Sequence, residues 1–499
     1  MTCEPIFADE YKSCCILPMG ELPNLKRAWG ARRKSPWIVG CPADTFAAVV
    51  EQRIEQIARL DRARPLVLIA ESDPIVFLAC FWAGLLQGCD LALTNPHWGQ
   101  REWQQVFSLL TPDLCWGEPA IPRPAPQTSL APYPEPRILI PTGGTSGQVR
   151  FAIHTWATLS AAVHGFLDYF GGECIHAYCV LPLYHVSGLM QALRTWFSGG
   201  QLVVQPFKSL RQGDRQIQPA PAWFISLVPT QLHRLLSADT ANHSTDFTTW
   251  LSQFQAILLG GAPAWPPLLA QARKQQLPIA LTYGMTETAA QIATLKPQDF
   301  LKGLQSSGQV LPHARVTIQP EMDMAAIGQP LPANQVGRIC IQTESLMLGY
   351  LPSSEADFAA EQSLRTQFYP DDLGYLDPQG YLHIVGRTSH KIITGGENVF
   401  PTEVEAALWA TQQVKDVCVI GLPDPDWGQI VTAVYVPAHD QVTAQTLKAA
   451  LRKKLSAYKH PKQWMATATL PRNAQGKVNR QALLEQVSSS NGLGLLKKH

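Results

Sequence analysis

Residues 138–155 read Ile-Leu-Ile-Pro-Thr-Gly-Gly-Thr-Ser-Gly-Gln-Val-Arg-Phe-Ala-Ile-His-Thr. One apolar run enters this segment, a second leaves it, and glycine and hydroxyl residues lie between them. Glycines let a backbone approach a ligand closely, and N–H and hydroxyl groups donate to anions. Arg150 adds a charge that cannot be deprotonated. The segment therefore predicts a phosphate-binding loop, with a glycine-rich surface hairpin as the alternative.

This loop differs from a Walker loop. The pattern G-x-x-x-x-G-K-[ST] is absent, and no helix start follows the last glycine. The next strong helix start is Thr155, so we expect the loop to join two strands.

Length and composition narrow the class of protein. The chain has 499 residues, a formal net charge of +1 and 16% charged residues, which does not resemble a nucleic-acid-binding protein. The 11 cysteines contain no C-x-x-C pair, which favours reduced thiols over disulfides or a zinc site. The N-terminus lacks signal-peptide features, and the most apolar segment, 75–86, is shorter than the about 20 residues that span a bilayer. We expect a cytoplasmic protein with no membrane span and no nucleic-acid partner.

Strands and helices alternate after residue 60. Pro65–Ala70 and Asp90–Thr94 read as buried strands, and between them Asp73 caps a helix over Ile75–Gln87 with Pro74 at its first position. This alternation predicts a parallel sheet covered by helices. After the loop we expect helices over Trp156–Phe170 and Gly188–Phe197.

Several later strands end in polar or glycine residues, where open α/β sheets bind ligands. The strand that begins at Cys179 runs to Tyr184-His185, and the strand over Ala222–Val228 runs to Pro229. Two more end at Gly260 and at Tyr283. We expect a nucleotide site at this edge.

The pattern changes to short alternating strands after Gly303 and to a compact α+β segment after Arg387. We expect an α/β fold with a large N-terminal domain (1–386) of helix-covered sheets plus a small β-barrel-like part. A small mobile α+β C-terminal domain (387–499) follows it. The expected elements of the C-terminal domain are a helix over Glu403–Thr411, strands over Val414–Leu422 and Thr432–Val436, and a helix over Thr443–Ala457.

Five motifs in this order resemble those of the adenylate-forming acyl-CoA synthetase family, over nearly the whole chain. The first two are the loop at Thr142 and Tyr283-Gly-Met-Thr-Glu-Thr, which resembles the family's adenylate motif. The other three are Pro370–Asp377 with Gly386-Arg387, Gly395–Glu405 and Pro471–Arg480. Within the family, Pro182-Leu-Tyr-His-Val-Ser-Gly188 is most similar to the o-succinylbenzoate–CoA ligases of menaquinone or phylloquinone synthesis.

The resemblance implies a ligase that works in two steps. An aromatic carboxylic acid attacks the α-phosphate of ATP to give an acyl-adenylate and pyrophosphate, and coenzyme A then displaces AMP. ATP and coenzyme A are the implied co-substrates, Mg²⁺ is the implied metal, and o-succinylbenzoate is the implied acid. We expect a monomer or a homodimer. The protein's task is to position the reactants and stabilise phosphoryl charge.

The resemblance also implies roles for individual residues. Thr286 donates to the α-phosphate, Glu287 with Thr145 holds Mg²⁺, and Lys477 bridges the carboxylate and the α-phosphate. As alternatives, Tyr283 is an ordinary buried tyrosine and Glu287 a carboxylate at a helix N-terminus. The implied nucleotide-binding residues are Thr142, Gly143, Gly144, Thr145, Ser146, Gly147 and Arg150 at the phosphates, Tyr283 at adenine, and Asp372 and Arg387 at the ribose, together with Gly261, Ala262, Gly284 and Met285.

The C-terminal domain is expected to rotate between the two steps, since Lys477 must leave before coenzyme A enters. Gly395 and Gly396 would then face the site. Lys459 is a candidate for the phosphates of coenzyme A, with a solvated surface lysine as the alternative.

Three positions depart from the family pattern. Val149-Arg150 replaces a proline and lysine, and arginine keeps the charge with a bidentate fork. Pro370-Asp371 replaces threonine and glycine, which leaves two adjacent carboxylates as ribose candidates. Ser389 occupies the hinge position where an aspartate is common.

The acid substrate is expected to lie near the strand end at His185. Arg194 lies two helical turns beyond Ser187, so both point one way, and we expect Arg194 to hold the second carboxylate of a succinylbenzoate. The rest of the expected pocket floor is formed by Gly260, Gly261 and Gln291, with the two glycines leaving room for an aromatic ring.

Three alternatives remain open. One is another aryl- or acyl-CoA ligase, and a second is a carrier-loading adenylation enzyme, although no carrier domain follows Lys477. A third is a non-enzymatic nucleotide sensor on the same fold.

Overall fold

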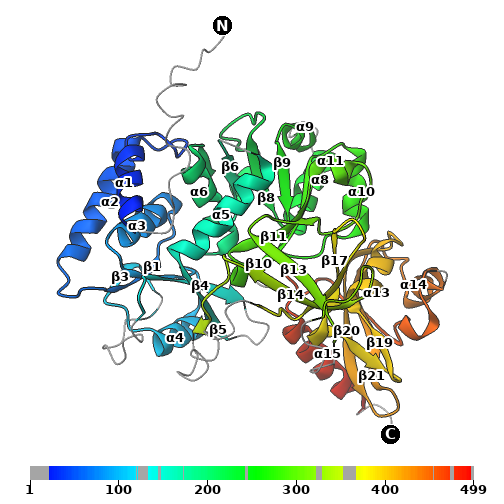
Figure 1. Ribbon diagram of the computed structural model, residues 1–499. Helices are drawn as coiled ribbons and strands as arrows, with labels where there is room; N and C mark the ends of the chain where they lie inside the picture. Colours follow the sequence, from blue (N-terminus) through cyan, green and yellow to red (C-terminus); the bar gives the residue numbers. More distant parts are fainter. Residues whose placement is uncertain are drawn as a thin grey trace.

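The computed structural model describes residues 22–119, 121, 133–143, 148–171, 174–241, 246–321, 329–351, 367–452, 454–472 and 477–495. Within these residues the chain forms four sheets with helices around and between them (Figure 1). Two large sheets lie in the first part of the chain, a small antiparallel sheet follows, and an α+β part with its own sheet ends the chain. This arrangement confirms the predicted fold class.

The first large sheet has the strand order β15-β5-β4-β2-β1-β3. Strands β1 to β4 pair in parallel, whereas β4, β5 and β15 pair antiparallel. Thr142 on β4 lies opposite Arg150 on β5, so the loop joins two strands as predicted. The strands are β1 (Leu66–Ala70), β2 (Asp90–Leu93), β3 (Leu114–Gly117), β4 (Arg137–Gly143), β5 (Val149–Thr155) and β15 (Tyr350–Leu351).

The second large sheet has the order β12-β11-β10-β9-β8-β6-β7, parallel from β7 to β10. The expected strand from Cys179 to Tyr184 is wrong: β6 ends at Cys179, because its pairing with β7 stops there and Pro182 lacks a backbone donor. The strands are β6 (His176–Cys179), β7 (Leu202–Val204), β8 (Trp223–Leu227), β9 (Ala256–Leu259), β10 (Ile279–Met285), β11 (Ala290–Leu295) and β12 (Gln309–Val310).

Helices fill the space between the two large sheets. The main hydrophobic core joins side chains of both sheets with those of α3, α5 and α6. The carboxylate of Asp73 accepts hydrogen bonds from the N–H groups of Ile75 (2.8 Å) and Val76 (3.0 Å), which confirms the predicted cap of α3. The helices of this part are α1 (Leu22–Arg32), α2 (Ala43–Ala58), α3 (Pro74–Leu86), α4 (Gln100–Leu109), α5 (Trp156–Phe170), α6 (Val186–Ser198), α7 (Phe207–Arg211), α8 (Pro229–Ala241), α9 (Phe247–Ser252), α10 (Pro266–Lys274), the 3₁₀ helix η1 (Thr286–Thr288) and α11 (Pro297–Leu301).

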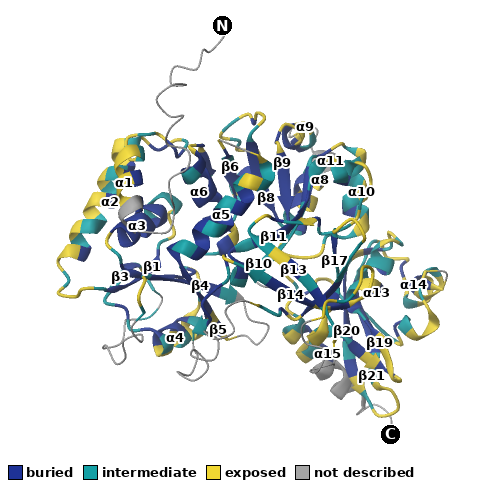
Figure 2. Ribbon diagram, in the orientation of Figure 1, coloured by how far each residue is buried: buried dark blue, intermediate teal, exposed yellow. Residues whose placement is uncertain are grey.

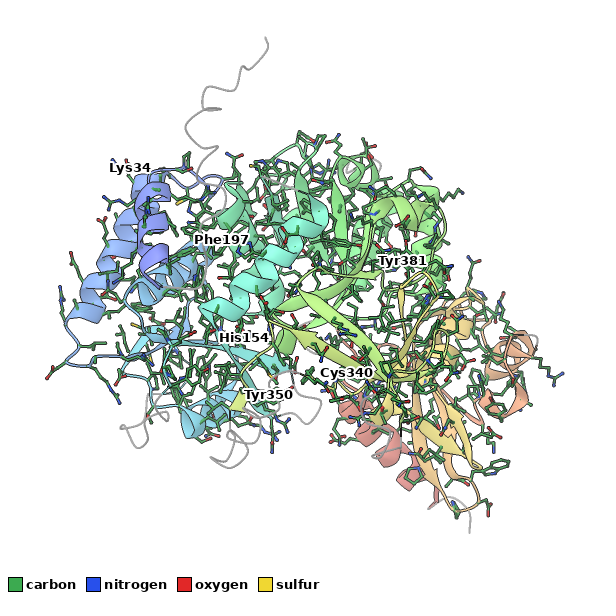
Figure 3. The ribbon with its side chains drawn as sticks, in the orientation of Figure 1. Lys34, His154, Phe197, Cys340, Tyr350 and Tyr381 are labelled. Atoms are coloured by element: carbon green, nitrogen blue, oxygen red, sulfur yellow. The ribbon has the colours of Figure 1, made fainter. Side chains whose placement is uncertain are left out.

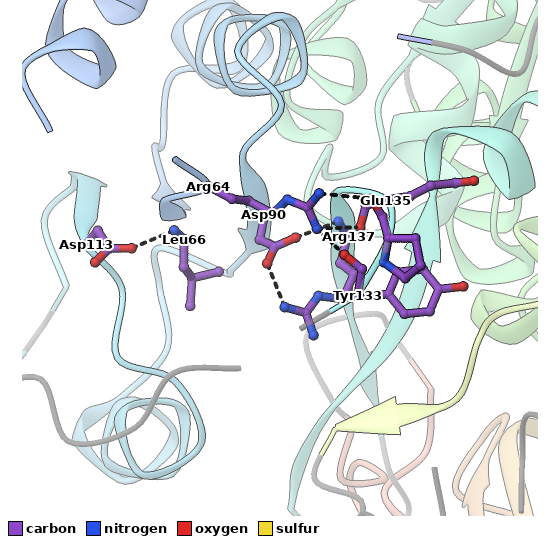
Figure 4. A network of polar contacts seen from close by, with 8 residues as sticks. Arg64, Leu66, Asp90, Asp113, Tyr133, Glu135 and Arg137 are labelled. Carbon is purple, nitrogen blue, oxygen red and sulfur yellow. Dashed lines mark hydrogen bonds and ion pairs between the residues drawn. The ribbon is translucent and has the colours of Figure 1, made fainter. Parts of the chain in front are cut away.

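A buried ion pair fixes the start of β4 (Figure 4). The guanidinium of Arg137 contacts the carboxylate of Asp90 at 2.7 Å, and the Arg137 N–H donates to the same carboxylate at 2.7 Å. Asp113 accepts from the N–H of Leu66 at 2.7 Å, and Arg64 donates to the carbonyl of Pro134 at 2.9 Å. Removing one partner of a buried pair is costly, so this network holds in place the strand that leads into the loop.

The third sheet is antiparallel in the order β13-β14-β16-β17. It places Asp372, the first residue of β16, opposite Arg387, the last residue of β17. Its strands are β13 (Ala314–Gln319), β14 (Gly337–Thr343), β16 (Asp372–Leu376) and β17 (Leu382–Arg387).

The last sheet has the order β19-β18-β21-β20, with β22 paired to β21. The last expected helix is too long: α14 ends at Leu451 and not at Ala457, because Leu455 turns back to pack on the core of this part. The elements are η3 (Thr388–His390), β18 (Ile392–Thr394), β19 (Glu397–Val399), α13 (Pro401–Trp409), β20 (Val414–Asp424), β21 (Gly428–Pro437), α14 (Ala444–Leu451), η4 (Ala457–Lys459), β22 (Gln463–Ala466) and α15 (Arg480–Leu495).

Burial follows the layers (Figure 2). The strands of the two large sheets are largely buried, while α1 and α2 expose one side to solvent. No described helix has both the length and the apolar character that crossing a bilayer requires.

Candidate active site

A hydrogen-bond network joins three residues that the sequence assigned to the nucleotide. The hydroxyl of Tyr283, on β10, donates to Asp372 at 2.8 Å, and Nε of Arg387 donates to the other oxygen of Asp372 at 3.1 Å. Burial and the nearby carboxylate raise the pKa of Tyr283 well above its usual value, so its phenol stays protonated. Gly284 follows at a β-bulge, where a Cβ would lie 2.0 Å from the carbonyl oxygen of Ala290.

The two adjacent aspartates have different partners. Asp372 is 6% exposed and belongs to the Tyr283 network. Asp371 is exposed, and its carboxylate accepts hydrogen bonds from the main-chain N–H of Ser389 at 3.2 and 3.3 Å and from the Ser389 hydroxyl. Asp371 therefore holds the segment after β17, while Asp372 faces the tyrosine and arginine.

Glu287 and Arg150 are linked through Tyr350, which sequence reasoning missed. The hydroxyl of Tyr350 donates to the carboxylate of Glu287, and its ring lies 5.9 Å from the guanidinium carbon of Arg150. Tyr350 lies on β15, which pairs with β5 next to the loop (Figure 3). Its neighbours in the sequence form no recognisable motif, so only the pairing of β15 with β5 reveals it.

His154 is a second residue that the sequence did not indicate. His154 is labelled in Figure 3. Its ring is fully buried on β5, and Nε2 lies 2.8 Å from the carbonyl oxygen of Thr286. Burial lowers the pKa of His154 to about 4, so the ring is neutral and its Nε2–H donates to that carbonyl. His154 thus holds the backbone of Thr286 against β5.

Lys477 lies within electrostatic reach of residues from the first part of the chain. Partial loss of water and the charge of Arg387 lower the pKa of its ammonium, whereas Glu287 and Asp372 act in the opposite direction. Burial, assisted by the charge of Lys477, lowers the pKa of His185 to about 4. Lys477 is exposed to solvent, and the charges of Arg387, Glu287 and Asp372 act on its ammonium.

Arg194 carries a buried charge on α6. It is 4% exposed, its guanidinium carbon lies 4.0 Å from the centre of the Phe166 ring, and burial lowers its pKa to about 9. Its Nε and Nη2 atoms have no hydrogen-bond partner among the described residues, nor do the two ring nitrogens of His313. Burial and the charge of Arg194 lower the pKa of His313 to about 4. Arg194 therefore offers N–H donors, and the neutral ring of His313 offers one donor and one acceptor, that have no partner among the described residues.

The remaining acid-site residues are placed by their own local contacts. Ser187 is exposed at the start of α6, whereas Gln291 is buried and donates to the hydroxyl of Thr294 at 2.8 Å. A Cβ at Gly260 would lie 2.2 Å from the hydroxyl oxygen of Thr282. Close packing of β9 on β10 therefore explains this glycine without a ligand.

The remaining nucleotide residues fall into two groups. Gly144, Thr145, Ser146 and Gly147 lie outside the described residues, and Thr142 lies beside them on β4. Exposed Gly261, with φ +78°, and Ala262 follow the end of β9, while Met285 ends β10.

The residues assigned to coenzyme A lie in the last part of the chain. Gly395 and Gly396 form the turn between β18 and β19 with φ of +60° and +83°. A Cβ at Gly395 would lie 2.7 Å from the ring of Trp427, so this position requires glycine. Lys459 contacts both carboxylate oxygens of Glu403, at 2.6 and 2.8 Å.

The donor set limits the metal that this region could hold. Among the described residues, no three His, Cys, Asp or Glu side chains gather as a metal site. Mg²⁺ keeps several waters and is held by one or two carboxylates together with substrate phosphates. The single carboxylate of Glu287, oriented by Tyr350, fits that requirement.

Two family models match the chain, one over its first part and one over its last part. The AMP-binding enzyme model matches residues 74–351, and the AMP-binding enzyme C-terminal domain model matches residues 403–477. The first alone covers more than half of the chain. The chain belongs to the AMP-binding enzyme family. The matched segments contain Tyr283, Glu287, His185 and Lys477.

Two curated relatives with the same name illustrate what this AMP-binding enzyme is similar to. The 2-succinylbenzoate–CoA ligase of Enterococcus faecalis is 32% identical over 348 residues, covering 69% of this chain and 68% of the relative. The protein of the same name from Geobacillus sp. strain WCH70 is 29% identical over 468 residues, covering 88% and 92%. The AMP-binding enzyme is thus similar to these ligases over most of its length.

A solved structure with a similar fold carries the same activity in its name. The o-succinylbenzoate CoA synthetase of Bacillus subtilis in complex with the acyl-adenylate intermediate OSB-AMP has a TM-score of 0.77 and 25% identity, covering 92% of this chain and 97% of that chain. Together the matches confirm the predicted resemblance to adenylate-forming acyl-CoA synthetases and the prediction of an acid–thiol ligase.

Proposed function

We propose that this enzyme converts o-succinylbenzoate to o-succinylbenzoyl-CoA, with ATP as the co-substrate of the first step and coenzyme A of the second. The names of its relatives support this reaction. The observation that carries the choice of acid is the buried, incompletely hydrogen-bonded guanidinium of Arg194. The reaction belongs to menaquinone or phylloquinone synthesis in this proposal.

Arg194 and His313 recognise the second carboxylate of the acid. A buried guanidinium strongly favours a carboxylate partner, and o-succinylbenzoate has one carboxylate to react and another to be held. A ligand carboxylate would satisfy the Arg194 nitrogens that have no partner among the described residues. Acids with one carboxylate leave that charge uncompensated.

The adenylation step requires two anions to approach each other. Lys477 neutralises the carboxylate and the α-phosphate, since its ammonium lies within reach of Glu287 and Asp372. Thr286, whose backbone is held by His154, donates to the same phosphate. Asp372 and Arg387 hold the ribose, and Arg150 holds the outgoing pyrophosphate.

Glu287, with its carboxylate oriented by Tyr350, holds Mg²⁺ in this proposal. When bound, Mg²⁺ supplies positive charge to the phosphoryl oxygens. The Bacillus subtilis enzyme has also been solved with ATP and a magnesium ion.

Formation of the thioester requires Lys477 to leave. We infer that residues 1–386 and 387–499 are two units and that the second rotates about Ser389 relative to the first. In this proposal the described orientation is the adenylating one, because the charge of Glu287 acts on Lys477. After rotation, Gly395 and Gly396 face the acyl-adenylate, and Lys459 exchanges Glu403 for a phosphate of coenzyme A.

Acid-dependent ATP–pyrophosphate exchange over a panel of aryl acids tests the proposal. We expect exchange with o-succinylbenzoate far above that with benzoate or cinnamate, and a CoA thioester once coenzyme A is added. Preference for a mono-acid would refute the choice of acid. A product on a carrier protein only would support the carrier-loading alternative, and no exchange with any acid would support the nucleotide sensor.

Lys477→Ala tests the two-orientation mechanism. The variant should lose adenylation and largely keep thioester formation from supplied acyl-adenylate. Equal loss of both steps contradicts the mechanism. A cytoplasmic location and a monomeric or homodimeric state remain part of the proposal.

A further inference from the structure

Two tryptophans from the two inferred units stack on each other. The ring centroids of Trp265 and Trp409 are 5.0 Å apart and their planes differ by 14°. Trp265 precedes α10 in the first unit, and Trp409 is the last residue of α13 in the second. Helices α10 and α13 contact each other, which places this stack in the interface between the units.

Each ring is anchored in its own unit. Trp265 packs against the core of the second large sheet and meets the ring of His233 edge-on at 5.6 Å. Trp409 packs against the core of the C-terminal sheet. Both rings are half-buried. A change in the relative position of the two rings therefore requires a change in the relative position of the two units.

We propose that Trp265 and Trp409 form an aromatic latch that holds the second unit in the orientation where Lys477 lies within electrostatic reach of Glu287 and Asp372. This inference rests on the proposed two-step function. The latch acts through Lys477, so both tryptophans are positioning residues. Rotation of the second unit carries Trp409 with α13 away from Trp265 and releases the latch before the thioester forms.

The size of the contact suits a latch that opens during turnover. In addition to the effect of the area that it buries, a stacked aromatic pair shifts the equilibrium between two states by about two- to tenfold. Such a factor favours one orientation without excluding the other.

The ratio of the two half-reactions measures the latch directly, because each rate follows the population of one orientation. Trp265→Leu and Trp409→Leu should each lower the ratio of adenylation to thioester formation from supplied acyl-adenylate by about two- to tenfold. The double variant should match the single variants, since either substitution removes the whole stack. Trp409→Phe keeps a stacking ring and should restore the ratio to within about twofold of wild type.

Trp98→Leu is the matched control, because Trp98 is also half-buried and its partner Trp103, at 5.8 Å, lies in the same unit. It should lower the melting temperature without changing the ratio. Three outcomes would contradict the proposed latch. They are an unchanged ratio in the single variants, additive effects in the double variant, and equal loss of both half-reactions with an unchanged melting temperature.

Circular dichroism separates failure of the latch from failure of the proposed function. Subtracting the spectrum of either single variant from that of wild type should give the same exciton couplet of a stacked tryptophan pair. Absence of the couplet overturns the latch whatever the activity. A wild-type enzyme that shows the couplet but no exchange with any acid refutes the proposed function and, with it, the catalytic role of the latch.

Discussion

The hydroxyl of Tyr350 donates a hydrogen bond to the carboxylate of Glu287. Tyr350 lies on an edge strand that pairs with β5, and Glu287 lies in η1 after β10. One hydrogen bond therefore connects the sheet that carries the phosphate loop to the sheet that carries the adenylate motif. Partners that orient a metal-binding carboxylate commonly affect metal affinity by about 10-fold or more.

Tyr350→Phe should therefore raise the Mg²⁺ concentration needed for half-maximal ATP–pyrophosphate exchange by about 10-fold, with little change in the KM for the acid. A Mg²⁺ titration of the exchange rate checks this. Tyr369→Phe is the control, because Tyr369 also lies under an arginine, Arg338, but donates to Gln367. A Mg²⁺ dependence equal to that of wild type would show that Tyr350 does not orient the metal-binding carboxylate.

Substituting each aspartate by asparagine should show which of the two carboxylates, Asp371 or Asp372, binds the ribose of ATP. Asp372 accepts from both Tyr283 and Arg387, so its loss should raise the KM for ATP by about 10- to 100-fold. Asp371 contacts Ser389 instead, and its substitution should leave the KM for ATP within about twofold of wild type. Steady-state kinetics over ATP concentration decide the assignment, and the reverse order of effects would give the ribose to Asp371.

His154 should make the folded protein less stable in acid. Its pKa is about 4 in the folded state and about 6.5 in an unfolded chain, so the unfolded chain takes up the proton first as the pH falls. Its contribution to stability is fully present above pH 6.5 and is lost progressively between 6.5 and 4, by about 3 kcal/mol in all.

His154→Gln keeps an N–H donor for Thr286 but does not titrate. Urea unfolding at several pH values should show a smaller loss of stability between pH 6.5 and 4 in this variant than in wild type. The exposed His439→Gln serves as control and should keep the wild-type slope. An identical slope in His154→Gln and wild type would contradict the assignment.

Arg194→Met should raise the KM for o-succinylbenzoate by about 100-fold, because removing one partner of a buried charge pair costs about 3 kcal/mol or more. The KM for a mono-acid should stay unchanged. Arg273→Met is the control, since Arg273 stacks on Phe300 at 4.4 Å outside the acid site. An unchanged KM for o-succinylbenzoate in Arg194→Met would remove the role of Arg194 as the acid's partner.

Much of the fold could be predicted because local signals agreed with the final packing. Asp73 and Pro74 mark the start of α3, and the apolar run at Leu66–Ala70 has the length of a buried strand. The strand expected to reach Tyr184 failed because Val180 and Leu183 are buried without belonging to β6. An apolar run indicates burial, whereas the end of a strand depends on its neighbours.

Some residues of the candidate site could be predicted from the sequence, whereas others are revealed only by the fold. Tyr283, Glu287, Asp372 and Lys477 lie in recognisable motifs, and the structure brings them together. Tyr350 and His154 act through contacts with residues 63 and 132 positions away. No local pattern in the sequence records such distant pairs. The partners of Asp371 and Asp372 likewise depend on the fold, since the two residues are adjacent in the chain.

Arg194 also affects how the stability of this protein can change during evolution. A buried guanidinium two of whose nitrogens have no hydrogen-bond partner among the described residues lowers the stability of the unliganded fold. Selection for heat resistance alone would therefore replace Arg194 with an apolar residue such as methionine, at the expense of substrate choice. If a thermally adapted descendant keeps Arg194, its enzyme still uses the acid with two carboxylates.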